Sequence, residues 1–369
     1  MEVVTPSTID DLATVLRDAA ATGASVDVRG AGTKSGWGAP GRPADVIVDT
    51  TSLNTVVEHA EADLVVTVQA GTRLGELQRL LAGSGQWLAL DPPEVAATVG
   101  GVVAAAASGP RRLRYGTPRD LLIGITVVLV DGIVARSGGK VVKNVAGYDL
   151  GKLFTGSFGT LGIIASCTFR LHPLPAARRV VSVSTEDPAQ VADALARSTA
   201  EPAAVEWDGR AAHVLLETAA AAADPQAAEM AQLLGSDAVT DVVPASFGRR
   251  PWQSGDIALK VTHRLSCLGP AVTAIRRRWP DAAIAAHLGS GVLWAGWPAA
   301  KGLTSAELDD LRAVIASYDG TVVVVQAPPA VKDGLDVWGP VSGFAVMERI
   351  KERFDPDGRM RPGRFVGGL

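Results

Sequence analysis

The sequence contains very few cysteines. Of its 369 residues only two are cysteines, Cys167 and Cys267, and they lie far apart in the chain. Two thiols cannot build a disulfide framework, and an iron–sulfur cluster needs four thiolates or their equivalents. The sequence therefore predicts a protein of a reducing compartment that carries no iron–sulfur centre of its own.

Further absences narrow the class of protein. The N-terminus, MEVVTPSTIDD, lacks the basic and apolar regions of a signal peptide, and no apolar run is long enough for a membrane helix. A net charge of -4 argues against nucleic acid as a main partner. We expect a cytoplasmic protein, which partners could hold at the inner face of a membrane. Its 47% of hydrophobic residues suffice for a sizeable core.

One stretch is unusually rich in small residues. Residues 91–109, DPPEVAATVGGVVAAAASG, contain almost no charge after Glu94 and no large side chain to fill a core. Small residues allow another group to approach the backbone closely. The stretch fits a flat anionic cofactor held by main-chain N–H groups, and it fits equally well a helix start packed tightly on a sheet.

Two other glycine-rich loops surround it in the sequence. Residues 29–41, RGAGTKSGWGAPG, follow an expected strand, but no helix opens directly after them as a Rossmann fingerprint requires. The segment Gly32-Thr33-Lys34-Ser35 also lacks the earlier glycine of a Walker A loop. This loop could form a phosphate-binding nest or a tight surface turn. Residues 156–162, GSFGTLG, are a third loop of the same kind.

The periodicity of the chain predicts an α+β protein. We expect a helix after Ser7, with Ser7 as the N-cap and Asp10 reaching back, and a second helix capped by Thr72. Asp224-Pro225 is expected to open a later helix, and Thr304 and Glu307 form a capping box.

The composition predicts three parts. These are a first domain over residues 1–175, a smaller ferredoxin-like α+β domain over 176–335, and a C-terminal helix and tail over 336–369 that pack back on the first domain.

The order of the motifs, rather than any single motif, carries a family resemblance. RGAGTKSG, VQAG, DPP…TVGGVVAAAASG, RYGTPRD, KNVAGYDL and GSFGTLGII together resemble the FAD-binding domain of the vanillyl-alcohol oxidase (PCMH-type) superfamily, over about residues 1–175. Within that superfamily, KNVAGYDL, the WGP at Trp338 and the tail FDPDGRMRPGR resemble the FAD-binding E subunits of bacterial glycolate oxidases.

The resemblance implies where FAD would bind. Because Thr33 stands where some relatives attach the flavin to a histidine, it implies non-covalent FAD. Three separated turns would contribute the binding residues: Gly30, Ala31, Gly32, Thr33, Lys34 and Ser35; Thr98, Gly100, Gly101, Ser108, Gly109 and Tyr115; and Gly159, Gly162, Ile163 and Ile164.

The resemblance also implies oxidation of glycolate or another short 2-hydroxy acid to the 2-keto acid. The chemistry needs a cation for the substrate carboxylate and a base for the hydroxyl proton. His287, Tyr148 and Arg361 are the candidates, and each also has a structural interpretation. Lys143 is an alternative to Tyr148 on the flavin side.

The segment His287-Leu288-Gly289-Ser290-Gly291-Val292-Leu293-Trp294 resembles the metal segment of related 2-hydroxy acid dehydrogenases, but it departs from their pattern. Ser290 replaces an acidic residue and Trp294 replaces the second histidine, so we expect no metal.

The family implies a second FAD subunit and an iron–sulfur subunit as partners, to which electrons would pass. A chain that carries flavin for electron transfer or assembly, without turnover of its own, is the alternative hypothesis.

Overall fold

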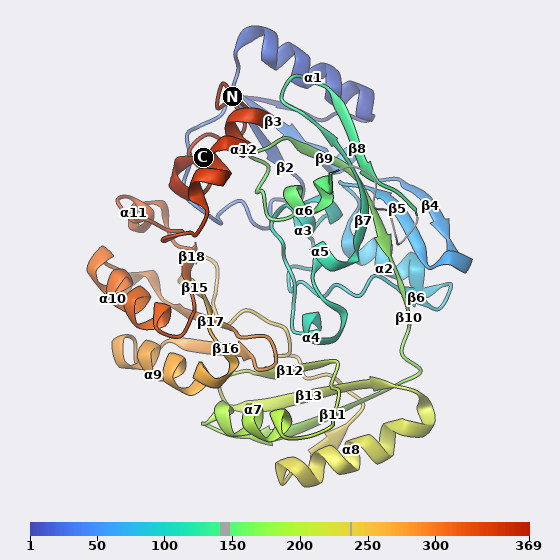
Figure 1. The fold of residues 1–369 in the computed structure, drawn as a ribbon, viewed down its shortest axis with the longest axis vertical. Coiled ribbons are helices and arrows are strands. Elements are labelled where there is room, and N and C mark those ends of the chain that lie inside the picture. The colour runs from blue at the N-terminus through green and yellow to red at the C-terminus, as the bar shows by residue number, and fades with distance from the viewer. Residues whose placement is uncertain (141–147, 237) are drawn as a thin grey trace. The chain divides into compact units, whose positions relative to one another are not determined.

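The computed structural model describes residues 1–140, 148–236 and 238–369, which form two compact units (Figure 1). Unit 1 consists of Met1–Ser108, Gly116–Leu174 and Pro340–Leu369, and unit 2 of Gly109–Tyr115 and Pro175–Gly339. Both units combine sheets with helices, which confirms the predicted α+β class. In the described part of the chain, no helix has the length and apolarity needed to cross a bilayer.

Unit 1 is built around two sheets. A parallel sheet of three strands has the order β1-β3-β2, and an antiparallel sheet of five strands has the order β4-β5-β9-β7-β8. Short β6 and β10 pair separately. The elements are β1 (Glu2–Val4), α1 (Ile9–Thr22), β2 (Val26–Arg29), β3 (Val46–Asp49), β4 (Val56–Ala60), β5 (Val65–Gln69), α2 (Leu74–Ala82), β6 (Gln86–Trp87), α3 (Val99–Ala104), α5 (Pro118–Leu121), β7 (Leu122–Val128), β8 (Val134–Gly138), α6 (Leu150–Phe154), β9 (Ile163–Arg170), β10 (His172–Pro173) and α12 (Phe344–Phe354).

The two sheets of unit 1 share a core with helix α1. Leu12 and Leu16 of α1 are fully buried in one cluster with Val26 of β2 and Ile163 of β9. Met360, from the end of the chain, is part of the same cluster. Met360 also pairs with Val26 in an isolated parallel bridge. The C-terminal tail is therefore an integral part of unit 1.

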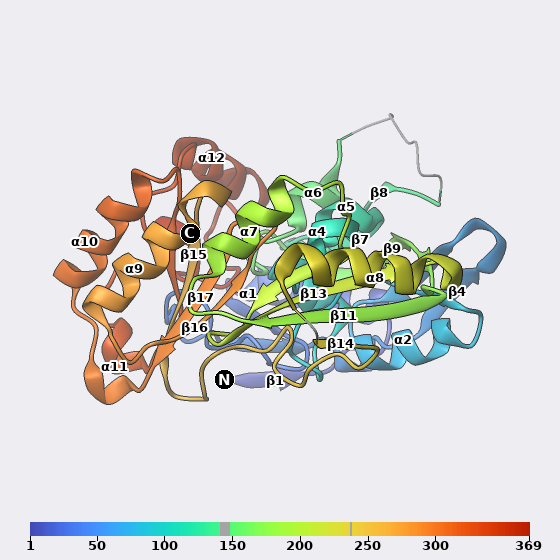
Figure 2. The same cartoon turned by 90° about the horizontal axis from the view of Figure 1, so that it is seen from below.

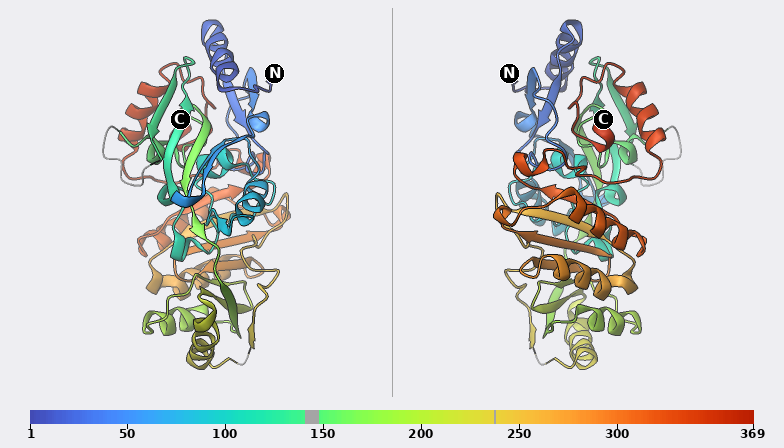
Figure 3. Two further views of the ribbon diagram at one scale, coloured as in Figure 1. Left: turned by 90° about the vertical axis from the view of Figure 1, so that its right-hand side faces the viewer. Right: turned by 90° about the vertical axis from the view of Figure 1, so that its left-hand side faces the viewer.

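Helix α12 fixes the path of that tail. Figure 3 shows α12, in red, beside the green elements of unit 1 in both views, and the ring of Phe354 meets that of Phe154 of α6 edge-on at 5.9 Å. The buried ammonium of Lys351 donates to Asp355 Oδ2 (2.6 Å) and to the carbonyls of Thr160 (2.8 Å) and Met360 (2.9 Å). One lysine thus joins α12, the tail and the 156–162 loop.

Unit 2 is built on one antiparallel sheet of eight strands, in the order β14-β11-β13-β12-β16-β17-β15-β18. Its helices α7 to α10 lie along one side of the strands in Figure 2. The elements are α4 (Arg112–Tyr115), β11 (Ala177–Ser184), α7 (Pro188–Ala196), β12 (Ala204–Trp207), β13 (Ala211–Thr218), α8 (Ala220–Leu234), β14 (Ala238–Thr240), β15 (Ile257–Thr262), α9 (Leu268–Arg278), β16 (Ala283–His287), β17 (Val292–Trp297), α10 (Ser305–Ala316), β18 (Val322–Gln326) and α11 (Pro329–Lys332).

The two faces of this sheet differ in chemistry. Because side chains alternate along a strand, Trp207 and Trp297 lie on one face, where the guanidinium of Arg276 of α9 approaches the Trp207 ring at 5.4 Å. The opposite face carries acidic and basic side chains. On this face the register pairs Glu206 with His287, and it pairs Trp294 with Lys260 on the next two strands. We call this the polar face.

The segment Gly109–Tyr115 is held on the polar face by Glu217. The Glu217 carboxylate is fully buried and accepts from Arg111 (2.8 Å) and from the Tyr115 hydroxyl (3.2 Å), while Arg114 donates to the Glu217 carbonyl (2.6 Å). Burial, aided by the negative charge of Glu217, raises the pKa of Tyr115 to about 12. Arg111 and Arg114 are therefore structural in unit 2.

Of the four predicted helix starts, one is confirmed and three are wrong. The Thr304–Glu307 capping box is present. The first helix, in contrast, is capped by Thr8 with Asp11, one residue later than expected from Ser7 and Asp10. Helix α2 has Arg73 as its N-cap, not Thr72. Helix α8 begins at Ala220 and contains Pro225, because the alanines before Asp224 are strong helix formers.

Candidate functional site

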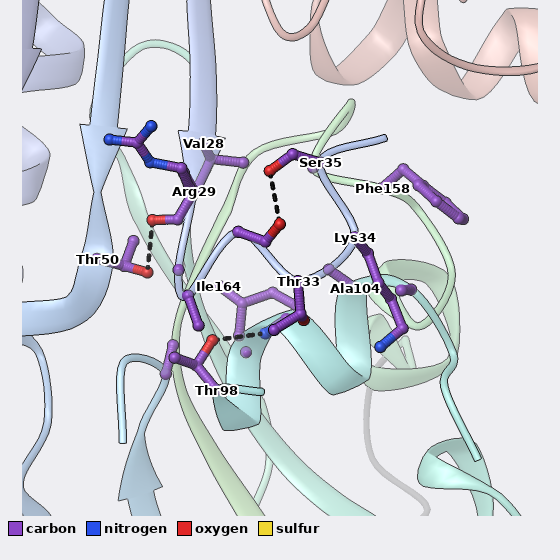
Figure 4. A pocket seen from close by; sticks show the side chains of 18 of the residues that line it. Val28, Arg29, Thr33, Lys34, Ser35, Thr50, Thr98, Ala104, Phe158 and Ile164 are labelled. Carbon is purple, nitrogen blue, oxygen red and sulfur yellow. Dashed lines mark hydrogen bonds between the residues drawn. The ribbon is translucent and has the colours of Figure 1, made fainter. Parts of the chain in front are cut away.

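A pocket in unit 1 lies where the three glycine-rich loops meet (Figure 4). In the close-up, Arg29 and Thr50 border it on one side and Lys34 and Phe158 on the other. Its lining comprises Val28, Arg29, Gly30, Ala31, Gly32, Thr33, Lys34, Ser35, Thr50, Ala70, Thr98, Gly100, Gly101, Ala104, Ala105, Phe158, Gly159, Gly162, Ile164 and Arg361. The loops that the sequence singled out are therefore brought together.

The loop after β2 offers unused hydrogen-bond donors. It turns back on itself through Ser35, whose amide and hydroxyl both donate to the Gly32 carbonyl, and Gly32 adopts a left-handed φ of 71°. Across residues 1–140, 148–236 and 238–369, the amides of Ala31, Gly32 and Thr33 find no protein acceptor. Consecutive free N–H groups in such a turn suit a phosphate.

Close contact between two loops requires glycine at position 30. A Cβ there would lie 2.3 Å from the Thr98 hydroxyl oxygen, which is closer than atoms can approach. The Thr98 hydroxyl in turn caps α3 by accepting from the Gly101 amide (Figure 4). The first loop and the start of α3 thus form one continuous wall of the pocket.

The first backbone amides of α3 are already hydrogen-bonded within the chain, so this segment offers the pocket a surface rather than free N–H donors. The Val99 amide donates to Thr72 O (2.9 Å) and the Gly100 amide to Ala70 O (2.8 Å). A Cβ on Gly100 would meet the Ala70 methyl at 2.6 Å, so glycine is needed there for packing against the chain itself. Of the two interpretations of the small-residue stretch, tight packing of a helix start explains Gly100, while Gly101, Ala104 and Ala105 line the pocket.

Two cations at the pocket wall are anchored by carboxylates. Lys34 Nζ lies 2.6 Å from Glu94 Oε2, and both side chains are largely buried. Arg361 pairs with Asp27 at 2.5 Å and donates to the Phe158 carbonyl (2.9 Å). Burial lowers the pKa of Arg361, and Asp27 opposes that shift. Both cations thus lie at the pocket wall, each beside a carboxylate.

The remaining predicted cofactor residues lie elsewhere. Ser108, Gly109, Tyr115 and Ile163 are absent from the lining of this pocket, and Tyr115 is bound to Glu217 in unit 2. Their role toward the cofactor stays a prediction. Conversely, Phe158 and Ala104 line the pocket without having been singled out, although both lie inside motifs that were.

The three catalytic candidates occupy different environments. Tyr148 is 93% exposed, Arg361 is bound to Asp27, and both belong to unit 1. His287 belongs to unit 2, where it is buried with its Nε2 3.6 Å from Glu206 Oε1. Burial, and then the charges of Arg250, Arg112 and Lys260, lower the pKa of His287 to about 3. Lys143 lies outside the described residues.

The residues around His287 do not fit a divalent metal. Within the described ranges, no three histidine, cysteine or acidic side chains gather closely enough to ligate an ion. Position 294 offers an indole ring, and the guanidinium of Arg250 lies only 3.7 Å from its centroid. A cation in that place repels a metal ion rather than binding it.

Sequence reasoning missed Lys260 in this region. It lies opposite Trp294 in the sheet, in a strand that is otherwise largely apolar, IALKVT. Burial lowers the pKa of Lys260 to about 8, and the nearby charges of Arg112 and Arg250 add to the shift. A lone lysine inside an apolar strand was the available signal, because buried lysines are rare.

Comparison with known proteins supports the interpretation of this pocket as a cofactor site. Residues 2–138 match the model of a family described as an FAD binding domain. Among curated proteins, the chain is 30% identical over 245 residues to glycolate oxidase subunit GlcD of Bacillus subtilis, which covers 65% of this chain and 52% of that protein.

Two further relatives match over the first part of the chain. Glycolate oxidase subunit GlcE of Escherichia coli is 37% identical over 150 residues (39% of this chain, 43% of the relative). The mitochondrial D-lactate dehydrogenase [cytochrome] 1 of Saccharomyces cerevisiae is 40% identical over 147 residues (39% of this chain, 25% of the relative). The chain thus spans about half or less of the length of these relatives.

A solved structure shares the fold over nearly the whole chain. An alkyldihydroxyacetonephosphate synthase superposes with a TM-score of 0.70 at 16% identity, covering 98% of this chain and 77% of the other. This likeness shows the fold alone. The family match confirms the predicted resemblance to PCMH-type FAD-binding domains over residues 2–138, and FAD is the cofactor of this chain.

Proposed function

We propose that this chain is the FAD-binding subunit of a glycolate oxidase-like complex, which oxidises glycolate or another short 2-hydroxy acid to the 2-keto acid. The observation that carries the proposal is the pocket of unit 1, in which the amides of Ala31, Gly32 and Thr33 face no acceptor among the residues that the structure describes. The names of the GlcD, GlcE and D-lactate dehydrogenase relatives support the substrate class.

Some residues of the chain would bind FAD, and others would take part in the chemistry. The turn at Ala31 to Thr33 would hold the phosphates of FAD, with Lys34 and Arg361 supplying positive charge. Bound FAD supplies the acceptor for the two electrons that leave the substrate carbon. The substrate needs a cation for its carboxylate, and we propose His287, Tyr148 and Arg361 as the residues from which the catalytic groups come.

Electrons would then leave to other subunits. Two cysteines, of which Cys167 is fully buried, are too few to hold an iron–sulfur cluster. We therefore propose a second FAD subunit and an iron–sulfur subunit as partners; the names of two relatives as glycolate oxidase subunits support an assembly of several chains.

A second candidate function is a flavin-carrying subunit for electron transfer or assembly without turnover. The state of His287 favours it, since an imidazole whose pKa is lowered to about 3 is a poor base near neutral pH. The strong exposure of Tyr148 and the pairing of Arg361 with Asp27 point the same way.

One experiment separates the two functions. The purified chain is loaded with FAD, made anaerobic and mixed with glycolate or D-lactate while the flavin absorbance is followed. Bleaching of the flavin by the chain alone supports turnover. A stable yellow protein that bleaches only after the partner subunits are added contradicts it and supports the carrier function.

A further inference from the structure

Three cationic side chains converge on the polar face of unit 2. The ring of Trp294 lies 3.7 Å from the guanidinium carbon of Arg250 and 5.7 Å from the ammonium of Lys260. Arg112 lies near enough to lower the pKa of both Lys260 and His287. We call Lys260, Arg250, Arg112, His287 and Trp294 the Trp294 cluster.

The surroundings of Lys260 disfavour its charged form. Like charges brought together in a partly buried site repel one another, and each also loses hydration. Glu206 is the carboxylate of this face nearest to His287, at 3.6 Å, and it also accepts from the Gly248 amide. Among the residues that the structure describes, no carboxylate pairs with Lys260 and no acceptor binds its ammonium.

A second buried group in the cluster is also unsatisfied. His287 is 3% exposed, and its Nδ1 has no hydrogen-bond partner within the described chain. A polar atom buried without a partner destabilises the folded state, and in native structures such an atom commonly serves a role or binds a water or ion. Lys260 Nζ and His287 Nδ1 thus both lack the partner that an added anion with a hydroxyl or carboxyl group would supply.

We propose that the Trp294 cluster is an anion site that binds the carboxylate of an organic acid. Lys260 is the recognising group, Arg250 and Arg112 add positive charge, and the ring of Trp294 lies beside both Lys260 and Arg250. The identification of the anion as a 2-hydroxy acid rests on the proposed function; the anion site itself does not.

The proposal has a consequence that a metal site would not share. An ammonium loses its charge when it loses a proton, and the pKa of free Lys260 is lowered to about 8 by burial and by Arg112 and Arg250. His287 is neutral in this range. Binding should therefore be strong below pH 8 and weaken above it, by up to about tenfold per pH unit. A chelator should have no effect.

The test measures binding of oxalate, a dicarboxylate that cannot be oxidised as a hydroxy acid, to the full FAD-loaded chain by calorimetry. Lys260→Met should weaken binding at least about tenfold at pH 7, equivalent to about 1.4 kcal/mol. Lys260→Arg should stay within about threefold of the wild type and lose the weakening above pH 8. The matched control is Lys301→Met, an exposed lysine of unit 2 that pairs with Asp281.

A second measurement tests the role of Lys260 without comparing the affinities of variants. A lysine of lowered pKa reacts readily with acylating reagents, so oxalate should protect Lys260 from acetic anhydride when modified peptides are mapped by mass spectrometry. Thermal unfolding of each variant verifies that it has folded. The proposal is overturned if oxalate fails to bind, if EDTA abolishes binding, or if Lys260→Met binds within twofold of the wild type.

Failure here and failure of the proposed function are distinguishable. Oxalate that binds through Lys260 to a chain whose flavin is not bleached by glycolate leaves the anion site standing and removes the turnover. Bleaching by glycolate, together with Lys260→Met that binds oxalate within twofold of the wild type, leaves the turnover standing and removes the anion site.

Discussion

The ammonium of Lys34 and the carboxylate of Glu94, sixty positions apart in the sequence, meet at 2.6 Å in the wall of the FAD pocket. The contact joins the first glycine-rich loop to the stretch that leads into α3. It holds a buried positive charge beside amides that suit phosphate, which makes Lys34 the most direct candidate for charge-assisted recognition of the cofactor.

Lys34→Met should weaken FAD binding about 10- to 150-fold, because a hydrogen bond to a charged group contributes about 1.5–3 kcal/mol. Titration of the apoprotein with FAD, followed by the quenching of flavin fluorescence, measures the change. Lys140→Met is a suitable control, since Lys140 is exposed and pairs with Glu58 outside the pocket lining. Equal affinities of Lys34→Met and the wild type would remove Lys34 from the site.

Gly30→Ala should abolish tight FAD binding, because the new methyl group would lie 2.3 Å from the Thr98 hydroxyl and force the two loops apart. Adding Thr98→Ala, which removes that hydroxyl, should restore part of the affinity. Gly36→Ala in the same loop is the control, since a Cβ there meets nothing within 4 Å. A single Gly30→Ala variant with wild-type affinity in the same titration would contradict this account of the wall.

Lys351→Met should lower the free energy of unfolding by about 3–5 kcal/mol, because it leaves the buried Asp355 carboxylate without its counter-ion. Burial lowers the pKa of Lys351 while Asp355 opposes the shift, as expected for a pair withdrawn from water. Denaturant unfolding of the full chain measures the loss.

The neighbouring Glu352→Gln, at an exposed position of the same helix, should change stability by less than about 0.5 kcal/mol. Removing both charges with Lys351→Met and Asp355→Asn should cost less than the sum of the two single changes. Additive losses would show that the pair does not act as a unit.

Native protein should present one reactive thiol to a disulfide reagent. Burial raises the pKa of the fully buried Cys167 and keeps it as a neutral thiol, whereas Cys267 at the start of α9 is partly exposed. The absorbance of released thiolate should report one thiol per chain before denaturation and two after it. Cys267→Ser should leave none in the native state, and any remaining rapid reaction would place Cys167 nearer the surface.

Local patterns in the sequence predicted much of the fold. The capping box at Thr304 is in place, because it depends on residues only three positions apart. The predicted start of α8 at Asp224-Pro225 was wrong, because the alanines before Asp224 are strong helix formers and extend the helix back to Ala220.

The candidate site was predictable to the extent that it is made of backbone. Glycine-rich loops have a local signature, and nine of the sixteen cofactor positions expected from the family lie in the two loop regions at residues 30–35 and 98–101, all of them in the pocket lining. The contacts of Glu217 with Arg111 and of Lys260 with Trp294 join residues that no sequence pattern links. Side chains that pair across a sheet are fixed by its register, which only the complete fold determines.

The path of the chain constrains how the protein can be made and divided. The polypeptide passes between the two units four times, after Ser108, Tyr115, Leu174 and Gly339. During synthesis, the core around helix α1 is incomplete until Met360 has been made. We therefore expect the unfinished chain to need chaperone protection and unit 1 to fold slowly. A fragment of residues 175–339 would lack residues 109–115, and the buried Glu217 carboxylate would lose its contacts with Arg111 and Tyr115. The second unit is therefore not expected to fold as an isolated fragment.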